Sequence, residues 1–553
     1  MIRGFAEELY NGWSSATGRR LYVLPFILAL LAILLLVPCI ILNDIPQRDV
    51  ACRYAPMAEA IADGDYLLAF NPRIPLLHPL LGGIVCRLFC CNGFLAVKIC
   101  SMLCYALTLM PLMFLMRRLY GARVSFISGI LYLGTVPLLR FAFSGLRESL
   151  KCLLLVVAAL IAVKIWECRR DWRLYFIGGI MAFLMCMTRI EMIFCGAFFL
   201  LYLARLDVGE GIFPWRSLMA FCVATTGLLP VMFIYRKLNG RLILDSHLIS
   251  FEKTGALFLF LCLAVLVVYL LCYLWNMIPH QGRRRIVIGG IVLVFLGVLL
   301  KGIAAGLFRN PIADFYFLER CIEGMFSFML PLVVVGVFVR LFTGEWSKED
   351  NIVLIICIVH AASVIVPMVV LEDKILIHRR YLNPGIALAL GWSAVGWSAI
   401  VDFLKLFCPF KVKRRHLKAF LLAIGIVVTT CFVIYPFNEN LISESRREKR
   451  NVIRRFARAI RCQEEKDGRP ECNRHFDRNL RVAVVIWNEG GWTNSSKHVS
   501  VIPYLAGGCI SNQWEGEKYL VRMMPLSEEQ PAAEGRCLDR VNGKKLIYEV
   551  YAK

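Results

Sequence analysis

Long apolar runs alternate with short, mostly basic connections along the chain. Helices of roughly 20 apolar residues cross a bilayer core of roughly 30 Å. We predict about thirteen such spans, and the fifth and sixth are short enough to form one hairpin broken at Thr188-Arg189. The spans are expected at residues 21–42, 93–116, 124–143, 149–166, 173–188, 190–204, 216–235, 255–277, 286–307, 320–341, 351–371, 382–404 and 418–437. This pattern predicts an all-α polytopic membrane protein.

The composition agrees with a membrane location. Of the 553 residues, 59% are hydrophobic and 19% are charged, whereas soluble proteins carry roughly 25% charged residues. Residues 1–20 form a polar amphipathic lead, and the first span follows without a small-residue cleavage site. We therefore expect the first span to be retained and not removed as a signal peptide.

The net charge of +23 has two interpretations. One is the usual excess of Lys and Arg at cytoplasmic helix ends, and the other is attraction to anionic lipid or phosphate. The basic residues are scattered among the spans, so nucleic acid is not an expected partner. Basic clusters recur at every second connection, which places the N-terminus inside and an external face opposite it. These clusters are Arg19-Arg20, Arg117-Arg118, Arg169-Arg170-Arg173, Arg283-Arg284-Arg285 and Lys411-Lys413-Arg414-Arg415.

Two segments on the predicted external face differ from the spans. Residues 43–92, within a transmembrane domain at 1–437, form a long and charged first loop with a helical pattern near 57–62. Loops of this length are usually functional or disordered, and the apolar pattern favours a folded cap. Residues 438–553 are polar and contain no span. We predict that they form a small extracytoplasmic α/β domain.

The tail carries both helical and strand patterns. Val452, Phe456 and Ile460 have helical spacing, and the runs RVAVVIW and KKLIYEVY are typical of strands. Four cysteines lie here, and in an oxidising compartment they allow two disulfides in three connectivities. They are Cys462, Cys472, Cys509 and Cys537.

Charged residues recur at the span ends on the same external face. Asp49 and Arg53-Tyr54 lie in the first loop, Arg147-Glu148 precede the fourth span, and Arg189-Glu191 lie between the fifth and sixth. Ionisable groups at membrane depth usually face a cavity. Each has a plainer explanation: ion pairs within Arg147-Glu148 and Arg189-Glu191, a helix cap for Asp49, and a turn residue for His78 before Pro79.

Four motifs resemble those of GT-C membrane glycosyltransferases of the protein O-mannosyltransferase and lipid A aminoarabinose transferase type. RDVACRYAPMAEAIADGDY is similar to the family's first-loop signature, and LLHPLLGG to the segment that follows it. LMCMTRIEMIF resembles the family's Thr-Arg-Pro-Glu hairpin, and HRRYLNPGIALALG its entry to a late span. The resemblance covers about residues 20–405. Asp49 is followed by Val50, where many relatives have a second acid, so Asp49 is the sole acid at that position.

The resemblance implies transfer of a sugar from a polyprenyl-phosphate donor to an acceptor hydroxyl. The leaving group is a phosphate, which arginines bind bidentately, and the acceptor hydroxyl needs a general base. We expect Asp49 to be this base, with Glu148 second, and we expect inversion of the anomeric centre. Candidate phosphate ligands are Arg147, Arg189, Arg379 and Arg380, and candidate substrate ligands are Arg53, Tyr54, His78, Glu191 and Tyr381.

The resemblance implies neither a metal nor another cofactor. It also implies a bacterial inner membrane, with the active site and the tail on the periplasmic face. The acceptor is a glycolipid, a polysaccharide or a protein. Two other functions stay open: an oligosaccharyltransferase or polymer ligase with a lipid-diphosphate donor, and a transporter or flippase of lipid-linked sugars. WNEGGW stands in the tail where oligosaccharyltransferases carry Trp-Trp-Asp, and matched broken spans typical of transporters are not found.

Overall fold

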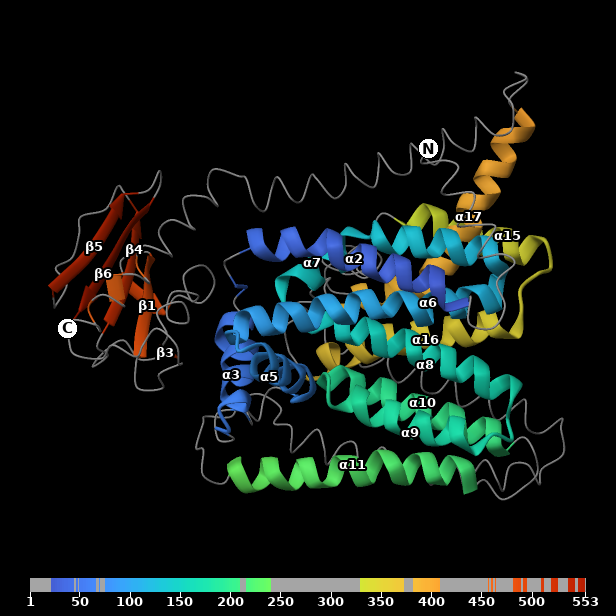
Figure 1. The fold of residues 1–553 in the computed structure, drawn as a ribbon, viewed down its shortest axis with the longest axis horizontal. Coiled ribbons are helices and arrows are strands. Elements are labelled where there is room, and N and C mark those ends of the chain that lie inside the picture. The colour runs from blue at the N-terminus through green and yellow to red at the C-terminus, as the bar shows by residue number, and fades with distance from the viewer. Residues whose placement is uncertain are drawn as a thin grey trace.

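Apolar helices packed side by side form most of this computed structural model (Figure 1). The structure describes residues 21–43, 46–47, 49–65, 69, 75–208, 215–239, 329–371, 381–407, 456, 459–460, 463, 481–488, 491–494, 509–511, 519–525, 536–542 and 546–552. The helices are α2 (Val23–Leu42), η2 (a π-helix, Val50–Tyr54), α3 (Ala55–Ala62), α5 (Leu77–Phe89), α6 (Gly93–Leu133), α7 (Val136–Ser144), α8 (Glu148–Glu167), α9 (Trp172–Cys186), α10 (Ile190–Val208), α11 (Trp215–Asn239), α15 (Leu330–Phe342), α16 (Lys348–Leu371), η5 (a 3-10 turn, Asn383–Gly385) and α17 (Ile386–Phe407).

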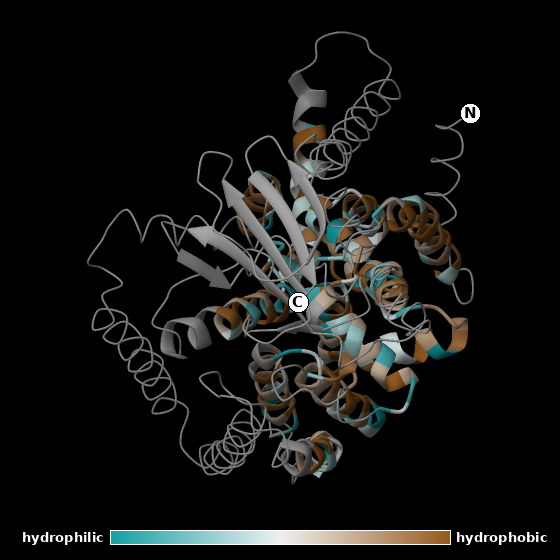
Figure 2. Cartoon of the chain, turned by 90° about the vertical axis from the view of Figure 1, so that its left-hand side faces the viewer, coloured by the Kyte–Doolittle hydropathy of each residue, from teal (hydrophilic) through white to brown (hydrophobic). Residues whose placement is uncertain are grey.

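Four helices in the described part of the chain are long and apolar enough to cross a membrane. They are Val23–Ile41, Gly93–Leu133, Glu148–Glu167 and Asn383–Asp402. In Figure 2 the described helices are mainly brown, with hydrophilic residues interspersed. The prediction of a mostly helical polytopic membrane protein is confirmed. The spans expected at 255–277, 286–307 and 418–437 lie outside the described residues, so the full count stays a prediction.

The span predicted at 124–143 is wrong as a single helix. The backbone of α6 turns at Gly121, where φ is +84°, and the second part of α6 ends at Leu133. Thr135 is extended, and α7 then begins with a proline in its first turn. Proline fixes its own φ near the helical value and lacks only an amide that has no partner in the first turn, so Pro137 favours a new helix start here. Two short helices therefore replace the expected span.

The first loop is folded, as predicted. The helical pattern near 57–62 is confirmed as α3, whereas α5 is an element that the sequence analysis did not predict. Helix α3 packs against both α5 and the start of α6. The Glu59 side chain accepts a hydrogen bond from the Gly93 amide at 2.7 Å. A Cβ at Gly93 would lie 2.2 Å from the Ala55 carbonyl oxygen, so this close crossing requires glycine.

Helices α15 and α17 touch through their backbones. A Cβ at Gly336 would lie 1.9 Å from the Trp392 carbonyl oxygen, and one at Gly396 would lie 2.1 Å from that of Leu332. Small residues at such crossings are typical of membrane helices, where close packing replaces the hydrophobic effect as the source of association. This close contact with α15 holds α17 in position. The turn η5, which precedes α17, reaches the candidate site.

The C-terminal strands form one mixed sheet, drawn orange to red in Figure 1. The strands are β1 (Arg481–Asn488), β2 (Gly491–Asn494), β3 (Cys509–Ser511), β4 (Tyr519–Pro525), β5 (Arg536–Asn542) and β6 (Leu546–Ala552). Their order is β2-β1-β4-β6-β5, and β3 also pairs with β1. β1 is parallel to β3 and β4, whereas its pairing with β2 and the pairings of β6 with β4 and β5 are antiparallel.

The predicted strands RVAVVIW and KKLIYEVY coincide with β1 and β6. Phe456 and Ile460 from the predicted helical pattern are helical and fully buried. A separate extracytoplasmic α/β domain stays a prediction. The structure does not describe the side chains of the four tail cysteines, Cys462, Cys472, Cys509 and Cys537. The two disulfides expected among them therefore stay a prediction.

Candidate functional site

The turn between α9 and α10 is the centre of the candidate site. The expected break at Thr188-Arg189 is confirmed, because α9 ends at Cys186 and α10 begins at Ile190. The amide of Leu77, at the start of α5, donates to the Met187 carbonyl at 3.0 Å. This bond ties the first loop to the turn. We call this end of the bundle, where the described part of the first loop packs, the loop end.

A buried ion pair joins this turn to α8. Arg189 Nη1 lies 3.1 Å from Glu148 Oε1, and their side chains are only 6% and 1% exposed. Glu148 thus pairs with an arginine of the other motif, whereas the expected Arg189–Glu191 pair involves a side chain outside the described ones. Burying both charges costs desolvation energy, which makes such a pair weak support for stability alone. Its place at a helix end within an apolar bundle favours a functional role.

Tyr381 covers the guanidinium of Arg189. The Arg189 Cζ atom lies 4.0 Å from the centroid of the Tyr381 ring, a cation–π contact. Lys151, which is fully buried on α8, donates from Nζ to the Tyr381 carbonyl at 2.9 Å. Tyr381 is therefore held at both its backbone and its ring. The sequence analysis missed Lys151, although a lysine three residues after Glu148 within an apolar run was a signal for it.

Tyr54 connects the first loop to the same charges. Its ring is buried, and the Arg147 Cζ atom lies 5.4 Å from the ring centroid. Burial raises the pKa of Tyr54; Arg147 and Arg189 lower that pKa, whereas Glu148 and Asp49 raise it further. Residues that are far apart in sequence thus surround one phenol, which stays protonated at neutral pH.

His78 is buried behind Tyr54 and is not the turn residue considered from the sequence. Their rings meet edge to face, with centroids 5.4 Å apart. Ser101 donates its only proton to the Leu146 carbonyl at 2.9 Å, so the 3.1 Å contact between His78 Nε2 and Ser101 Oγ requires a proton on Nε2. Burial, and then the charge of Arg147, lower the pKa of His78 to about 3. A neutral imidazole therefore supports Tyr54.

Asp49 lies at the edge of the site, just before η2. Its side chain is 16% exposed, and its Oδ1 is 3.6 Å from Arg53 Nη1, with the Arg53 side chain 50% exposed. The Asp49 side chain makes no capping hydrogen bond to η2, so the helix-cap interpretation is wrong. Asp49 is therefore more accessible than Glu148.

The remaining predicted ligands are only partly described. Arg379 and Arg380 lie outside the described residues, and so does the side chain of Glu191. The structure thus brings together Tyr54, His78, Arg147, Glu148, Arg189 and Tyr381, with Asp49 and Arg53 at the edge. Within the described ranges, no group of three or more His, Cys, Asp or Glu side chains could hold a metal ion.

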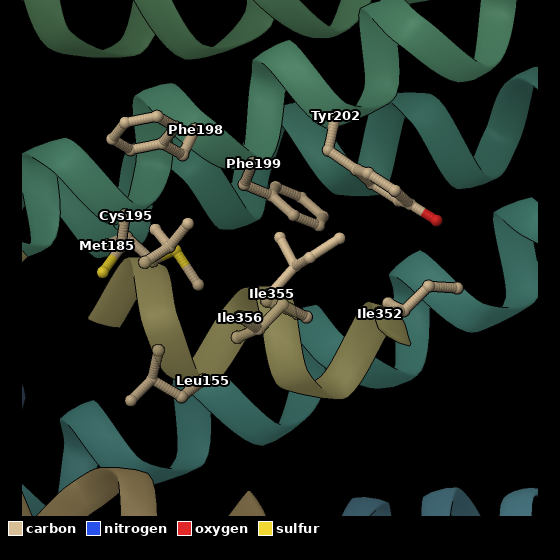
Figure 3. Close-up of a pocket in the computed structure, with 11 residues that line it drawn as sticks. Leu155, Met185, Cys195, Phe198, Phe199, Tyr202, Ile352, Ile355 and Ile356 are labelled. Atoms are coloured by element: carbon tan, nitrogen blue, oxygen red, sulfur yellow. The ribbon is translucent and has the colours of Figure 1, made fainter. Parts of the chain in front are cut away.

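An apolar groove runs between α10 and α16 (Figure 3). Phe198, Phe199 and Tyr202 from α10 and Ile352 and Ile355 from α16 line the groove. Phe198 is 47% exposed and Ile355 is 48% exposed, so the groove opens on the surface of the bundle. Residues of α8 and α9 complete its walls: Leu155, Ala158 and Met185.

The sequence and the fold are similar to those of known proteins. Residues 73–235 match the family described as dolichyl-phosphate-mannose-protein mannosyltransferase. The fold is similar to that of the Archaeoglobus fulgidus oligosaccharyltransferase in complex with Zn and sulfate, with a TM-score of 0.54 and 14% sequence identity over 90% of this chain and 67% of that one. No curated protein sequence matches the chain.

Two further solved structures are similar. The oligosaccharyltransferase AglB from Archaeoglobus fulgidus, with an inhibitory peptide and a dolichol-phosphate, has a TM-score of 0.52 and 14% identity over 90% of this chain and 69% of that one. ArnT from Cupriavidus metallidurans in the apo state has a TM-score of 0.44 and 12% sequence identity. The similarity covers 96% of this chain and 97% of that one.

The family match and the fold are both similar to one class, the GT-C membrane glycosyltransferases. The resemblance predicted from the sequence is therefore confirmed, and so is the predicted enzyme class, a glycosyltransferase. Within that class, the matching family model is the mannosyltransferase one, over residues 73–235.

Proposed function

We propose that this protein transfers a sugar from a polyprenyl-phosphate donor to an acceptor hydroxyl at the loop end of the bundle, on the extracytoplasmic face. The observation that carries the proposal is the buried Arg189–Glu148 pair, covered by Tyr381 and next to Tyr54 and Arg147. Fixed positive charge beside an apolar bundle suits a lipid whose head is a phosphate.

The donor phosphate binds to the arginines. Arg147 Nε is buried and, within the described residues, has no hydrogen-bond partner. Its N–H group can therefore donate a hydrogen bond to the phosphate. Arg189 is held in place by Glu148 and Tyr381, which orients its guanidinium without ligand. As the bond to the sugar breaks, negative charge grows on the phosphate, and preoriented donors stabilise that charge. Arg379 and Arg380 are proposed to complete the clamp.

Asp49 acts as the general base. A base must reach the acceptor hydroxyl, and Asp49 is partly exposed, with its Oδ1 atom 3.6 Å from the half-exposed Arg53. Glu148, by contrast, is buried and bound to Arg189, so we assign it to orienting the arginine. Attack by the deprotonating hydroxyl opposite the phosphate inverts the anomeric centre. Tyr54 and Tyr381 contact the donor, with His78 supporting Tyr54 from behind.

The groove between α10 and α16 receives part of the polyprenyl chain. Its wall residue Leu155 lies seven residues beyond Glu148 on α8, which corresponds to about 10 Å along a helix. Met185 lies one turn before Arg189. A lipid whose phosphate meets Arg189 would therefore reach this groove with its chain. The opening beside Phe198 allows entry from the bilayer.

The proposal is tested with purified protein and two radiolabelled donors that carry the same sugar, one on a polyprenyl phosphate and one on a polyprenyl diphosphate. Transfer from the monophosphate alone supports the proposal. Transfer from the diphosphate alone would replace it with the oligosaccharyltransferase or ligase alternative. If donor crosses reconstituted vesicles without loss of its sugar, the protein is a flippase. Mass spectrometry of envelope glycolipids, polysaccharides and proteins, with and without the gene, identifies the acceptor.

A further inference from the structure

Three cysteines lie within six residues at the end of α5. Cys90 is in the left-handed region, with φ of +47°, and among the described residues no other non-glycine has a positive φ. The amides of Cys90 and Cys91 both donate to the Cys86 carbonyl, the second at 3.3 Å. This is a Schellman-type helix end, where glycine is the usual left-handed residue.

Such a helix end brings two particular side chains together. The residue after the left-handed one commonly contacts the side chain five positions earlier, and here these two residues are Cys91 and Cys86. The Cys86 thiol donates to the Cys91 carbonyl at 2.6 Å, so its sulfur is directed at Cys91. The backbone hydrogen bond from the Cys91 amide to the Cys86 carbonyl also keeps the two residues close together, as a disulfide requires.

We propose that Cys86 and Cys91 form a disulfide in the native membrane, linking the end of α5 to the start of α6. The inference rests on the extracytoplasmic orientation given under the proposed function, because disulfides persist in oxidising compartments. The two thiols lose two protons and two electrons as the S–S bond forms. The oxidant is the disulfide of a thiol–disulfide oxidoreductase, which is reduced to its dithiol.

A catalysed exchange is needed because neither thiol ionises readily. Burial raises the pKa of Cys86 to about 12 and also raises the pKa of Cys91. Only the thiolate attacks a disulfide. Cys91 is partly exposed and Cys86 is buried, so the first attack on the oxidant comes from Cys91 and the resolving attack from Cys86.

The disulfide would stiffen the connection that carries the first loop. Asn92 follows Cys91 and caps α6, and the next amide, Gly93, binds Glu59 of α3. Helix α5 itself carries His78 behind Tyr54. Because the closed loop is short, its effect on the unfolded chain is small. Its main effect is to fix the α5–α6 elbow behind the candidate site.

Peptide mapping tests the inference on full-length protein from native membranes, solubilised in N-ethylmaleimide. Trypsin cleaves after Arg73, Arg87 and Lys98, which separates Cys86 from Cys90 and Cys91. We expect the two peptides to be linked before reduction and separate after it, with Cys90 alkylated. The link should persist in Cys90→Ser and disappear in Cys91→Ser, where Cys86 becomes alkylated.

Alkylation of both Cys86 and Cys91 without reduction would overturn the inference, as would a link that is lost in Cys90→Ser. Sugar transfer by the same preparation is measured separately. Active protein with three free thiols would exclude the disulfide and leave the proposed function standing. Protein that carries the Cys86–Cys91 link but transfers no sugar would support the disulfide and contradict the proposed function.

Discussion

Arg189 and Glu148 form an ion pair at 3.1 Å although 41 residues separate them in the sequence, and both side chains are buried. Losing one partner leaves the other charge buried without compensation. We expect Glu148→Gln and Arg189→Gln each to destabilise the protein by about 3–5 kcal/mol. Thermal unfolding in detergent measures this loss.

The double variant Glu148→Gln/Arg189→Gln separates stability from activity. It removes both charges, so it should regain most of the stability lost in either single variant. It should nevertheless bind donor poorly, because the guanidinium is gone. A double variant as unstable as the sum of the two single variants would show that the pair is not coupled as the structure indicates.

Lys151 is expected to position Tyr381. Lys151→Met keeps the length of the side chain but loses the hydrogen bond to the Tyr381 carbonyl. A hydrogen bond from a charged donor contributes about 1.5–3 kcal/mol. Its loss releases Tyr381 from its position over Arg189, so the KM for donor should rise about tenfold or more. Equal donor KM in wild type and Lys151→Met would contradict this role.

Acid should destabilise the protein partly through His78. The pKa of His78 is about 3 in the folded protein, whereas the ordinary pKa of histidine is 6.5. Between pH 3 and pH 6.5 the unfolded chain therefore binds more protons than the folded protein. The contribution of the neutral imidazole is complete above pH 6.5 and is lost as the pH falls, by at most about 1.4 kcal/mol per pH unit.

The matched variant for this test is His78→Gln, which keeps a donor for Ser101. Unfolding temperatures measured between pH 7.5 and 5 should fall more steeply for wild type than for the variant. Parallel curves would show that His78 is not the group responsible.

The topology prediction is tested by labelling introduced thiols in intact cells with an impermeant maleimide. Pro470→Cys should react from outside, and Lys413→Cys only after the cells are opened. Peptide mass spectrometry assigns the label against the native cysteines. Reaction of both positions from the same side would refute the span count and with it the extracytoplasmic site.

Local patterns predicted the elements well where propensity and packing agree. The helix near 57–62, the break at Thr188-Arg189 and strands β1 and β6 were all visible in the sequence. The expected span at 124–143 failed because hydropathy does not register a backbone break: Gly134 and Thr135 are apolar enough to continue the run, yet they end one helix before Pro137 favours the next.

The site was predictable as a set of residues and not as a set of contacts. The charged motifs pointed to Arg147, Glu148 and Arg189, but adjacent charges suggested local ion pairs. The observed partner of Glu148 comes from a different helix, which only tertiary packing determines. Lys151 was missed for a related reason, because its partner is a backbone carbonyl at the start of a distant helix.

The most direct test of the mechanism is Asp49→Asn, assayed with a radiolabelled polyprenyl-phosphate sugar and purified protein, with donor binding measured in parallel. Asparagine keeps the size of the side chain but cannot take up the acceptor proton. We predict that donor binding is kept, because the arginines hold the phosphate, while turnover falls by roughly a hundredfold or more. Transfer by Asp49→Asn at a rate near that of wild type would contradict the account and would move the general base to Glu148.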